Sequence, residues 1–171
     1  MGRMTIYLKK SLNIFFWILD KIDKKKFVIW YPKYLKWLGI QINIIEQAGT
    51  WISPSVFFDS SNYNLITIGY NVTISFDVAI LCHDYSIIHA AITVNKRVKE
   101  IIFKKVIIGN NVFIGARSLI LPGARIGDNC IIGGGSVVKG TLEPNSIYAG
   151  NPARKIGNIE DLALKYDNNL I

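Results

Sequence analysis

The sequence is poor in the residues that build disulfide-bonded and metal-bound proteins. Its 171 residues include two cysteines, Cys82 and Cys130, and two histidines, His83 and His89. Two cysteines do not make the framework of a small secreted scaffold, so a reduced, cytoplasmic setting is expected. A catalytic zinc ion takes three protein ligands, and two histidines are too few for a three-histidine site. We therefore expect no metal.

Long apolar runs are also missing. The stretch 12–19 is apolar but only eight residues long, whereas a helix that crosses a membrane needs about 20. The N-terminus shows no secretory signal. Half of the residues are hydrophobic and 19% are charged, a balance that excludes a disordered chain and predicts a packed core.

Basic charge is concentrated near the N-terminus. Residues 1–40 hold nine of the 20 Lys and Arg side chains but only two aspartates, and they interleave the lysines with aromatic residues. This pattern predicts an amphipathic helix that is interrupted near Pro32. Such a segment either caps the open end of a repeat fold or lies at a membrane interface, and both interpretations stay open. The charge comes with no nucleic-acid-binding module, so no nucleic acid partner is expected.

A repeat of six residues governs the rest of the chain. Aliphatic residues recur at this spacing at Ile108, Ile114, Ile120, Ile126, Ile132 and Val138, after a shorter series at Ile68, Ile74 and Ile80. Small or β-branched residues stand two positions before each, and side chains two apart lie on one face of a strand. Gly, Asn and Asp then supply the turns. The period predicts a solenoid of short parallel strands. An antiparallel sandwich is the weaker alternative, because its turns recur irregularly every 8–12 residues.

The repeat resembles the hexapeptide-repeat acyltransferase family. The resemblance implies an all-β solenoid, a left-handed parallel β-helix of about five triangular coils with eighteen residues in each coil. We expect a basic, aromatic helical segment over residues 1–45, the β-helix over 46–156 and a short tail over 157–171.

The repeat breaks between Ile80 and Ile102, which predicts a protruding loop near 84–99. The loop begins in the string LCHDYS, and His83 stands at its root. Imidazole ordinarily titrates near neutral pH and suits general-base catalysis, and the placement resembles the family's catalytic histidine. We predict His83 as the base and Asp84 as the group that orients its ring, with a backbone carbonyl or Asp77 as alternatives.

The remaining site residues are predicted from the loop and from three strings in the C-terminal part. Tyr85 and His89 lie in the loop and are expected to contact the acceptor, although a solvated loop face is the alternative. The strings IGARS, IGGGSVVKG and EPNSIYAGNPAR resemble the family's acetyl-CoA site. The resemblance implies cofactor-binding roles for Ala116, Gly134, Ser136, Lys139 and Arg154. The family commonly has Thr-Lys after the paired valines, whereas here Lys139 precedes Gly140.

The predicted function is acetyl-CoA-dependent O-acetylation of a sugar hydroxyl in the biosynthesis of a surface polysaccharide. The string LITIGYNVTISFDVAILCHDYS resembles the polysaccharide and colanic-acid branch of the family. The chain also resembles the family's maltose-type and galactoside-type O-acetyltransferases. The resemblance implies a homotrimer with sites between subunits and a small-molecule or lipid-linked acceptor. The expected location is cytoplasmic, at the inner membrane surface if the N-terminus binds lipid. Alternatives are a sugar-nucleotide N-acetyltransferase, a xenobiotic acetyltransferase and a non-catalytic β-helix scaffold.

Overall fold

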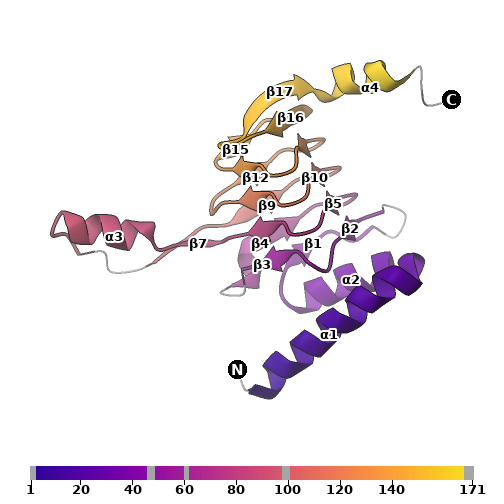
Figure 1. Cartoon of the computed structure of the whole chain (residues 1–171), viewed down its shortest axis with the longest axis horizontal. Helices are drawn as coiled ribbons and strands as arrows, with labels where there is room; N and C mark the ends of the chain where they lie inside the picture. Colours follow the sequence, from indigo (N-terminus) through magenta and orange to yellow (C-terminus); the bar gives the residue numbers. More distant parts are fainter. Residues whose placement is uncertain (1–2, 46–48, 60–61, 98–100, 168–171) are drawn as a thin grey trace.

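Short parallel strands stack into a three-sided prism in the computed structural model, which describes residues 3–45, 49–59, 62–97 and 101–167 (Figure 1). The first side is a sheet in the spatial order β1 (Gln41–Ile42), β4 (Ile66–Ile68), β9 (Val106–Ile108), β12 (Arg125–Ile126), β15 (Thr141–Leu142). The second side has the order β17 (Arg154–Asn158), β16 (Ser146–Ala149), β13 (Ile131–Ile132), β10 (Phe113–Ile114), β5 (Thr73–Ile74), β2 (Trp51–Ile52). The third side has the order β14 (Val137–Val138), β11 (Leu119–Ile120), β6 (Ala79–Ile80), β3 (Phe57–Phe58).

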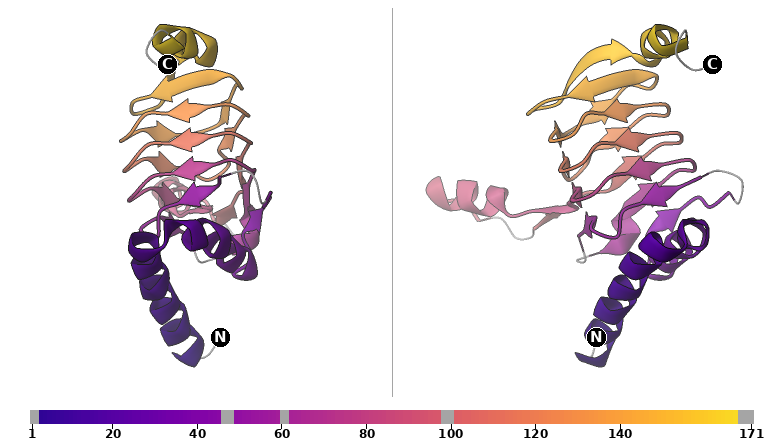
Figure 2. Two further views of the ribbon diagram at one scale, coloured as in Figure 1. Left: turned by 90° about the vertical axis from the view of Figure 1, so that its right-hand side faces the viewer. Right: turned by 45° about the vertical axis from the view of Figure 1, so that its right-hand side comes forward.

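The chain passes through the three sides in turn, and each full circuit of three strands adds one coil to the prism (Figure 2). Residues eighteen apart pair across neighbouring coils, as Ile114 does with Ile132 and Ile120 with Val138. The predicted left-handed parallel β-helix is therefore confirmed.

The core is the column of side chains that the six-residue repeat turns inward. These side chains are almost wholly buried, namely Ile68, Ile74, Ile80, Ile108, Ile114, Ile120, Ile126, Ile132 and Val138. Each such burial stabilises the fold by about 1.5–3 kcal/mol. Inward polar residues are satisfied locally, since the hydroxyl of Ser118 donates to the carbonyl of Gly115.

One corner of the prism carries a ladder of asparagines. Asn71, Asn111, Asn129 and Asn145 stack there, each with a backbone φ between 52° and 56°. The side-chain N–H of each asparagine donates a hydrogen bond to the side-chain oxygen of the next one along the chain, from Asn71 to Asn111, Asn129 and Asn145. The nitrogen–oxygen distances are 2.7–2.9 Å. Asparagine is among the few residues that adopt positive φ readily, and the ladder adds hydrogen bonds between coils.

An arm leaves the prism between the second and third coils (Figure 1). It consists of β7 (His83–Asp84), helix α3 (Ser86–Thr93) and β8 (Ile102–Phe103), with the two strands paired antiparallel. Ile68 pairs with Ile108, forty residues on, where undisturbed coils pair residues eighteen apart, so the excursion adds 22 residues. The expected loop near 84–99 was therefore too short, and its residues 98–99 lie outside the described ranges.

Two helices cover the N-terminal end of the prism, which we call the base (Figure 2). They are α1 (Arg3–Ile22) and α2 (Lys24–Trp37), and Pro32 lies inside α2. Phe27 and Leu35 of α2 are buried, and the ring of Phe16 from α1 packs against Tyr31 and Tyr34. The N-terminal segment therefore caps the solenoid. Within the described ranges, no helix is long and apolar enough to cross a membrane.

The element boundaries differ from the expected ones at both ends of the prism. β1 pairs with β4, so the first coil begins at Gln41 rather than at residue 46. A short 3-10 helix, η1 (Tyr63–Leu65), precedes β4. The expected tail over 157–171 contains the end of β17 and helix α4 (Ile159–Asp167), which lies at the end opposite to the base (Figure 1).

Candidate active site at the root of the arm

His83 lies where the chain turns away from the third sheet into the arm. Cys82, immediately before it, is buried, and its carbonyl accepts a hydrogen bond of 2.8 Å from the N–H of Lys104 on the returning chain. Both ends of the arm are thus fastened at one corner of the prism. The side chain of His83 remains 28% exposed.

The imidazole of His83 is held by a buried carboxylate that comes from the coil below. Oδ2 of Asp59 bonds Nδ1 of His83 and also accepts the N–H of Cys82 at 2.9 Å. Asp59 follows β3, and its side chain is only 4% exposed. Because Nδ1 is engaged by the carboxylate, the nitrogen that accepts a proton in the neutral ring is Nε2. This is the arrangement of a carboxylate-oriented general base.

Two aromatic rings border the imidazole. Tyr85 meets the ring of His83 edge-on, with centroids 5.3 Å apart, and Phe103 from the returning strand lies at 6.1 Å. Both rings are about half exposed, so they limit the rotation of the imidazole without sealing it from the outside. Tyr85 is therefore close to His83, as the predicted acceptor contact requires.

Asp84 does not occupy the orienting position expected for it. Its exposed carboxylate accepts the backbone N–H of Ser86 at 2.8 Å and so supports the turn into α3, which holds the pKa of this carboxyl below its ordinary value. Successive residues of a strand point to opposite faces, which explains why Asp84 and His83 diverge. Asp77, the alternative, lies at a different corner, 3.9 Å from Arg117. The position belongs to Asp59, which the sequence reasoning missed.

The second histidine and the two thiols do not join this pair. His89 is exposed on α3, beyond the two-stranded part of the arm. Burial, and then the charge of Asp59, raise the pKa of the Cys82 thiol to about 11, and burial also raises the pKa of Cys130. Both thiols are therefore protonated near neutral pH and unsuited to nucleophilic attack. In the parts of the chain that the structure describes, no three His, Cys, Asp or Glu side chains gather as a metal site would need.

The residues expected to hold the coenzyme lie on either side of the third sheet. Ala116 and Gly134 stack at the corner between the second and third sheets, where the N–H of Gly135 donates to the carbonyl of Ala116. A Cβ on Gly134 would approach that carbonyl to 3.1 Å, and a Cβ on Gly115 would come within 2.4 Å of the Gly134 nitrogen. A side chain at Gly115 or Gly134 would therefore collide with the neighbouring coil, which explains the glycines at these two positions.

The other three expected residues are placed differently from one another. Ser136 is buried, and its hydroxyl donates to the carbonyl of Gly133 and accepts the N–H of Gly150, so its side chain serves the core. Lys139 is exposed directly after β14, at the corner from which the arm departs two coils lower. Arg154 is exposed at the start of β17.

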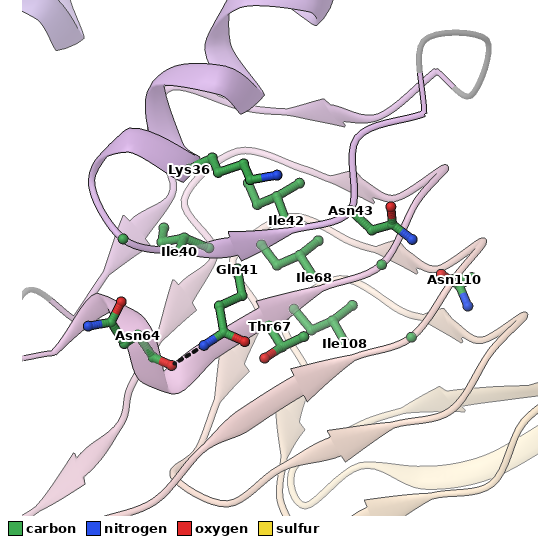
Figure 3. Close-up of a pocket in the computed structure, with 13 residues that line it drawn as sticks. Lys36, Ile40, Gln41, Ile42, Asn43, Asn64, Thr67, Ile68, Ile108 and Asn110 are labelled. Carbon is green, nitrogen blue, oxygen red and sulfur yellow. Dashed lines mark hydrogen bonds between the residues drawn. The ribbon is translucent and has the colours of Figure 1, made fainter.

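A cleft lies elsewhere, on the outer face of the first sheet (Figure 3). It has a volume of about 650 Å³, and its lining residues do not include His83. Polar side chains along it are Lys36, Gln41, Asn43, Asn64, Thr67 and Asn110. Amides, a hydroxyl and an ammonium group do not accept protons near neutral pH. The cleft therefore lacks a general base, and the arm root is the better candidate for chemistry.

Comparison with known proteins relates the chain to sugar acetyltransferases. Residues 105–140 match the family model described as bacterial transferase hexapeptide (six repeats). The galactoside O-acetyltransferase of Escherichia coli (strain K12) is 34% identical over 129 residues, which cover 65% of this chain and 62% of the relative. The chain thus spans less than two thirds of the length of that relative.

Two solved structures share the fold over most of the chain. The maltose O-acetyltransferase from Clostridium difficile 630 aligns with a TM-score of 0.57 and 25% identity, covering 87% of this chain and 83% of the other. A galactoside acetyltransferase in complex with coenzyme A aligns with a TM-score of 0.57 and 26% identity, covering 91% of this chain and 80% of the other.

Proposed function

The chain belongs to the hexapeptide-repeat acetyltransferase family, and on this premise we propose that it transfers an acetyl group from acetyl-CoA to a hydroxyl group of a sugar. The observation that carries the proposal is the pair of His83 and Asp59 at the arm root. A buried carboxylate that fixes one imidazole nitrogen leaves the other to accept a proton from a hydroxyl. The similarity of the chain to galactoside and maltose enzymes supports a sugar as the acceptor.

In the proposed mechanism, Nε2 of His83 accepts the proton of the acceptor hydroxyl as the oxygen forms its new ester bond. Asp59 holds the productive tautomer and stabilises the imidazolium that results. His83 then returns the proton to the departing sulfur, so the ring ends the cycle neutral. Acetyl-CoA, when bound, supplies the acetyl group as an activated thioester.

We place the coenzyme's slender arm at the corner of Ala116 and Gly134, because Gly134 is exposed and has no side chain to cover its main-chain groups. We assign to Lys139 and Arg154 the charge-assisted contacts to the phosphates, since both are exposed cations in the upper coils. The side chain of Ser136 takes no part in this assignment, because its hydroxyl is used inside the prism.

A homotrimer with its sites between subunits is part of the proposal. The arm root is open in the single chain, and exposed Phe57 and Phe76 line the neighbouring third sheet and its corner, which is the kind of apolar surface that a second subunit covers. Light scattering on the purified full chain is expected to give three times the monomer mass of 19.2 kDa.

For the acceptor, we propose a unit of a surface polysaccharide, modified on the cytoplasmic side. The arm extends well beyond the prism beside His83 (Figure 1), and Tyr85 and His89 lie along it. A surface of this length suits an acceptor with several sugar units. A sugar-nucleotide amine or a xenobiotic would need only the residues at the root. A scaffold would neither bind acetyl-CoA nor release thiol from it.

His83→Ala tests the proposal. Loss of the base is expected to lower kcat by at least about 10²-fold, while the affinity for acetyl-CoA, measured by calorimetry, stays the same. Turnover is followed by thiol release with galactosides, maltose, oligosaccharides, sugar nucleotides and chloramphenicol as acceptors. Thr93→Ala, on the exposed side of α3, controls for disturbance of the arm. Undiminished turnover by His83→Ala would refute the assignment.

A further inference from the structure

The two helices at the base carry apolar side chains on their outer surface as well as on their inner one. The inner side chains pack into the core, as Phe16 and Leu35 do. The outer ones are 45–78% exposed, namely Ile14, Phe15, Trp17, Ile18 and Ile22 of α1 with Ile29, Trp30 and Trp37 of α2. Exposed lysines lie among them, at Lys21, Lys25, Lys26, Lys33 and Lys36. We call these thirteen residues the basic aromatic face.

On α2 the two kinds of side chain share one side of the helix. Ile29, Lys33 and Trp37 are spaced four residues apart and so follow one another along the same surface. The ammonium of Lys33 also lies 5.7 Å from the ring centre of Trp30. An ordinary surface helix would present charged and polar residues on this side, because its apolar residues would face the core.

Two carboxylates, Asp20 and Asp23, lie near the five lysines of the face, so the net charge there is positive. Oδ1 of Asp20 accepts the indole N–H of Trp51 at 3.1 Å. Asp23 caps α2 by accepting the N–H of Lys26 and forms an ion pair with the same lysine at 3.2 Å. The complement of this face must therefore combine negative charge with an apolar layer.

Three kinds of partner can be compared by whether they supply both negative charge and an apolar layer. A second copy of the chain, meeting this face with its own, would bring lysines against lysines at an energetic cost. A nucleic acid would neutralise the lysines but would leave Ile14, Ile18 and Ile22 in water. An anionic bilayer satisfies both parts, because its phosphates meet the lysines and its interfacial zone takes up tryptophan and isoleucine.

We propose that the basic aromatic face docks on the surface of a lipid bilayer with anionic headgroups. Both helices lie at the same end of the prism, and the arm leaves the prism near that end (Figure 2). The helices lie in the interface rather than crossing it. Docking would hold the arm root about two coil spacings, roughly 10 Å, above the helices.

The first test uses the full chain and vesicles of phosphatidylcholine, with or without phosphatidylglycerol. Three of the four tryptophans, Trp17, Trp30 and Trp37, belong to the face, so intrinsic fluorescence reports on docking. Vesicles with phosphatidylglycerol should shift the emission to shorter wavelength, and brominated lipid should quench it. Added salt should weaken binding, because it screens the lysines. Equal binding to both kinds of vesicle, or binding to neither, would overturn the proposal.

The second test uses variants. Trp30→Ala combined with Trp37→Ala should weaken sedimentation with anionic vesicles about tenfold or more, and Lys33→Glu should weaken it further. Tyr166→Ala, an exposed aromatic residue on α4 at the opposite end, is the matched control and should bind normally. Far-ultraviolet circular dichroism verifies folding.

Two further readouts separate this proposal from others. If the tryptophan variants change the oligomer mass in light scattering and leave vesicle binding intact, the face is a subunit contact and the proposal is wrong. Turnover with water-soluble acceptors is measured independently. A chain that acetylates them but does not bind vesicles refutes docking and leaves the proposed function standing.

Discussion

At the scale of single residues, the buried carboxylate of Asp59 determines how His83 is presented. It bonds the imidazole and the N–H of Cys82 at once, and so it joins two neighbouring coils at the corner where the arm begins. A buried carboxylate without such partners would be strongly unfavourable. The position therefore requires both the charge and the geometry of an aspartate.

Asp59→Asn should lower kcat by about 10²–10⁴-fold, because the amide neither stabilises the imidazolium nor enforces the productive tautomer. KM for acetyl-CoA should change little, since the coenzyme corner is elsewhere. Asp84→Asn is the matched control, with the same chemical change one residue from His83, and should keep most of its activity. Steady-state kinetics on both variants decide the matter. A larger loss in Asp84→Asn would return the orienting role to that residue.

His83 was predictable from the sequence, whereas Asp59 was not. Histidine is scarce in this chain, and one of its two copies stands where a regular repeat stops. Asp59 lies 24 residues earlier, and only the stacking of coils brings the two together. A signal was present, because Val56 and Phe58 are both buried and fill the inward positions of an earlier strand. Because Phe58 is aromatic, a pattern of aliphatic residues at six-residue spacing does not include that strand.

At the scale of elements, the asparagine ladder combines a backbone requirement with side-chain bonding. Asn129 has a φ of 55° and sits in the middle, accepting from Asn111 and donating to Asn145. The two contributions are separable, because glycine satisfies the first without the second and alanine satisfies neither.

Asn129→Gly should destabilise the fold by about 1 kcal/mol through the lost hydrogen bonds, and Asn129→Ala by about 2 kcal/mol because strain is added. Denaturant unfolding monitored by circular dichroism gives the order. Asn95→Ala is the control, with a similar φ of 52° at the end of α3 but outside the prism. It should leave global unfolding unchanged. Equal losses for glycine and alanine at position 129 would mean that backbone strain is negligible there.

The strands of the prism were predictable, but the arm was only half predictable. A six-residue period is a local signal, so each short strand could be placed from its own neighbours. Ile102 looked like the next repeat position because it stands six residues before Ile108. It pairs instead with Asp84 in the arm. Antiparallel pairing of two-residue strands leaves no periodic trace, and this is why the expected loop was too short.

At the scale of the whole molecule, the prism and the arm are nearly independent structures. The coils before and after the arm pair directly with each other, without using any residue of the arm. These pairings join β4 with β9, β5 with β10 and β6 with β11. The family and the number of coils could be expected from the resemblance that the repeat carries, and the cap was one of two interpretations open for the N-terminal segment. The direction in which the arm projects depends on its own packing and could not.

Replacing residues 85–101 by Asn-Gly, the pair preferred in tight hairpins, should leave the prism folded and retain His83. The melting temperature should stay within about 4 °C of the parent, since the removed part contributes little to the core. If the arm contacts the acceptor, as proposed, KM should rise more for a long oligosaccharide than for a single galactoside. The ratio of the two effects is the measurement. Equal losses for both acceptors would place the acceptor's extended contacts elsewhere.

The arm enters and leaves the prism at one corner, next to the pair that carries the proposed chemistry. The length and sequence of the arm can therefore change without changing the register of the strands in the prism. If the arm contacts the acceptor, as proposed, exchanging the segment between its two strands for that of another protein should alter selectivity without redesigning the scaffold. A library of such exchanges on this one frame would provide a direct route to enzymes with new acceptors.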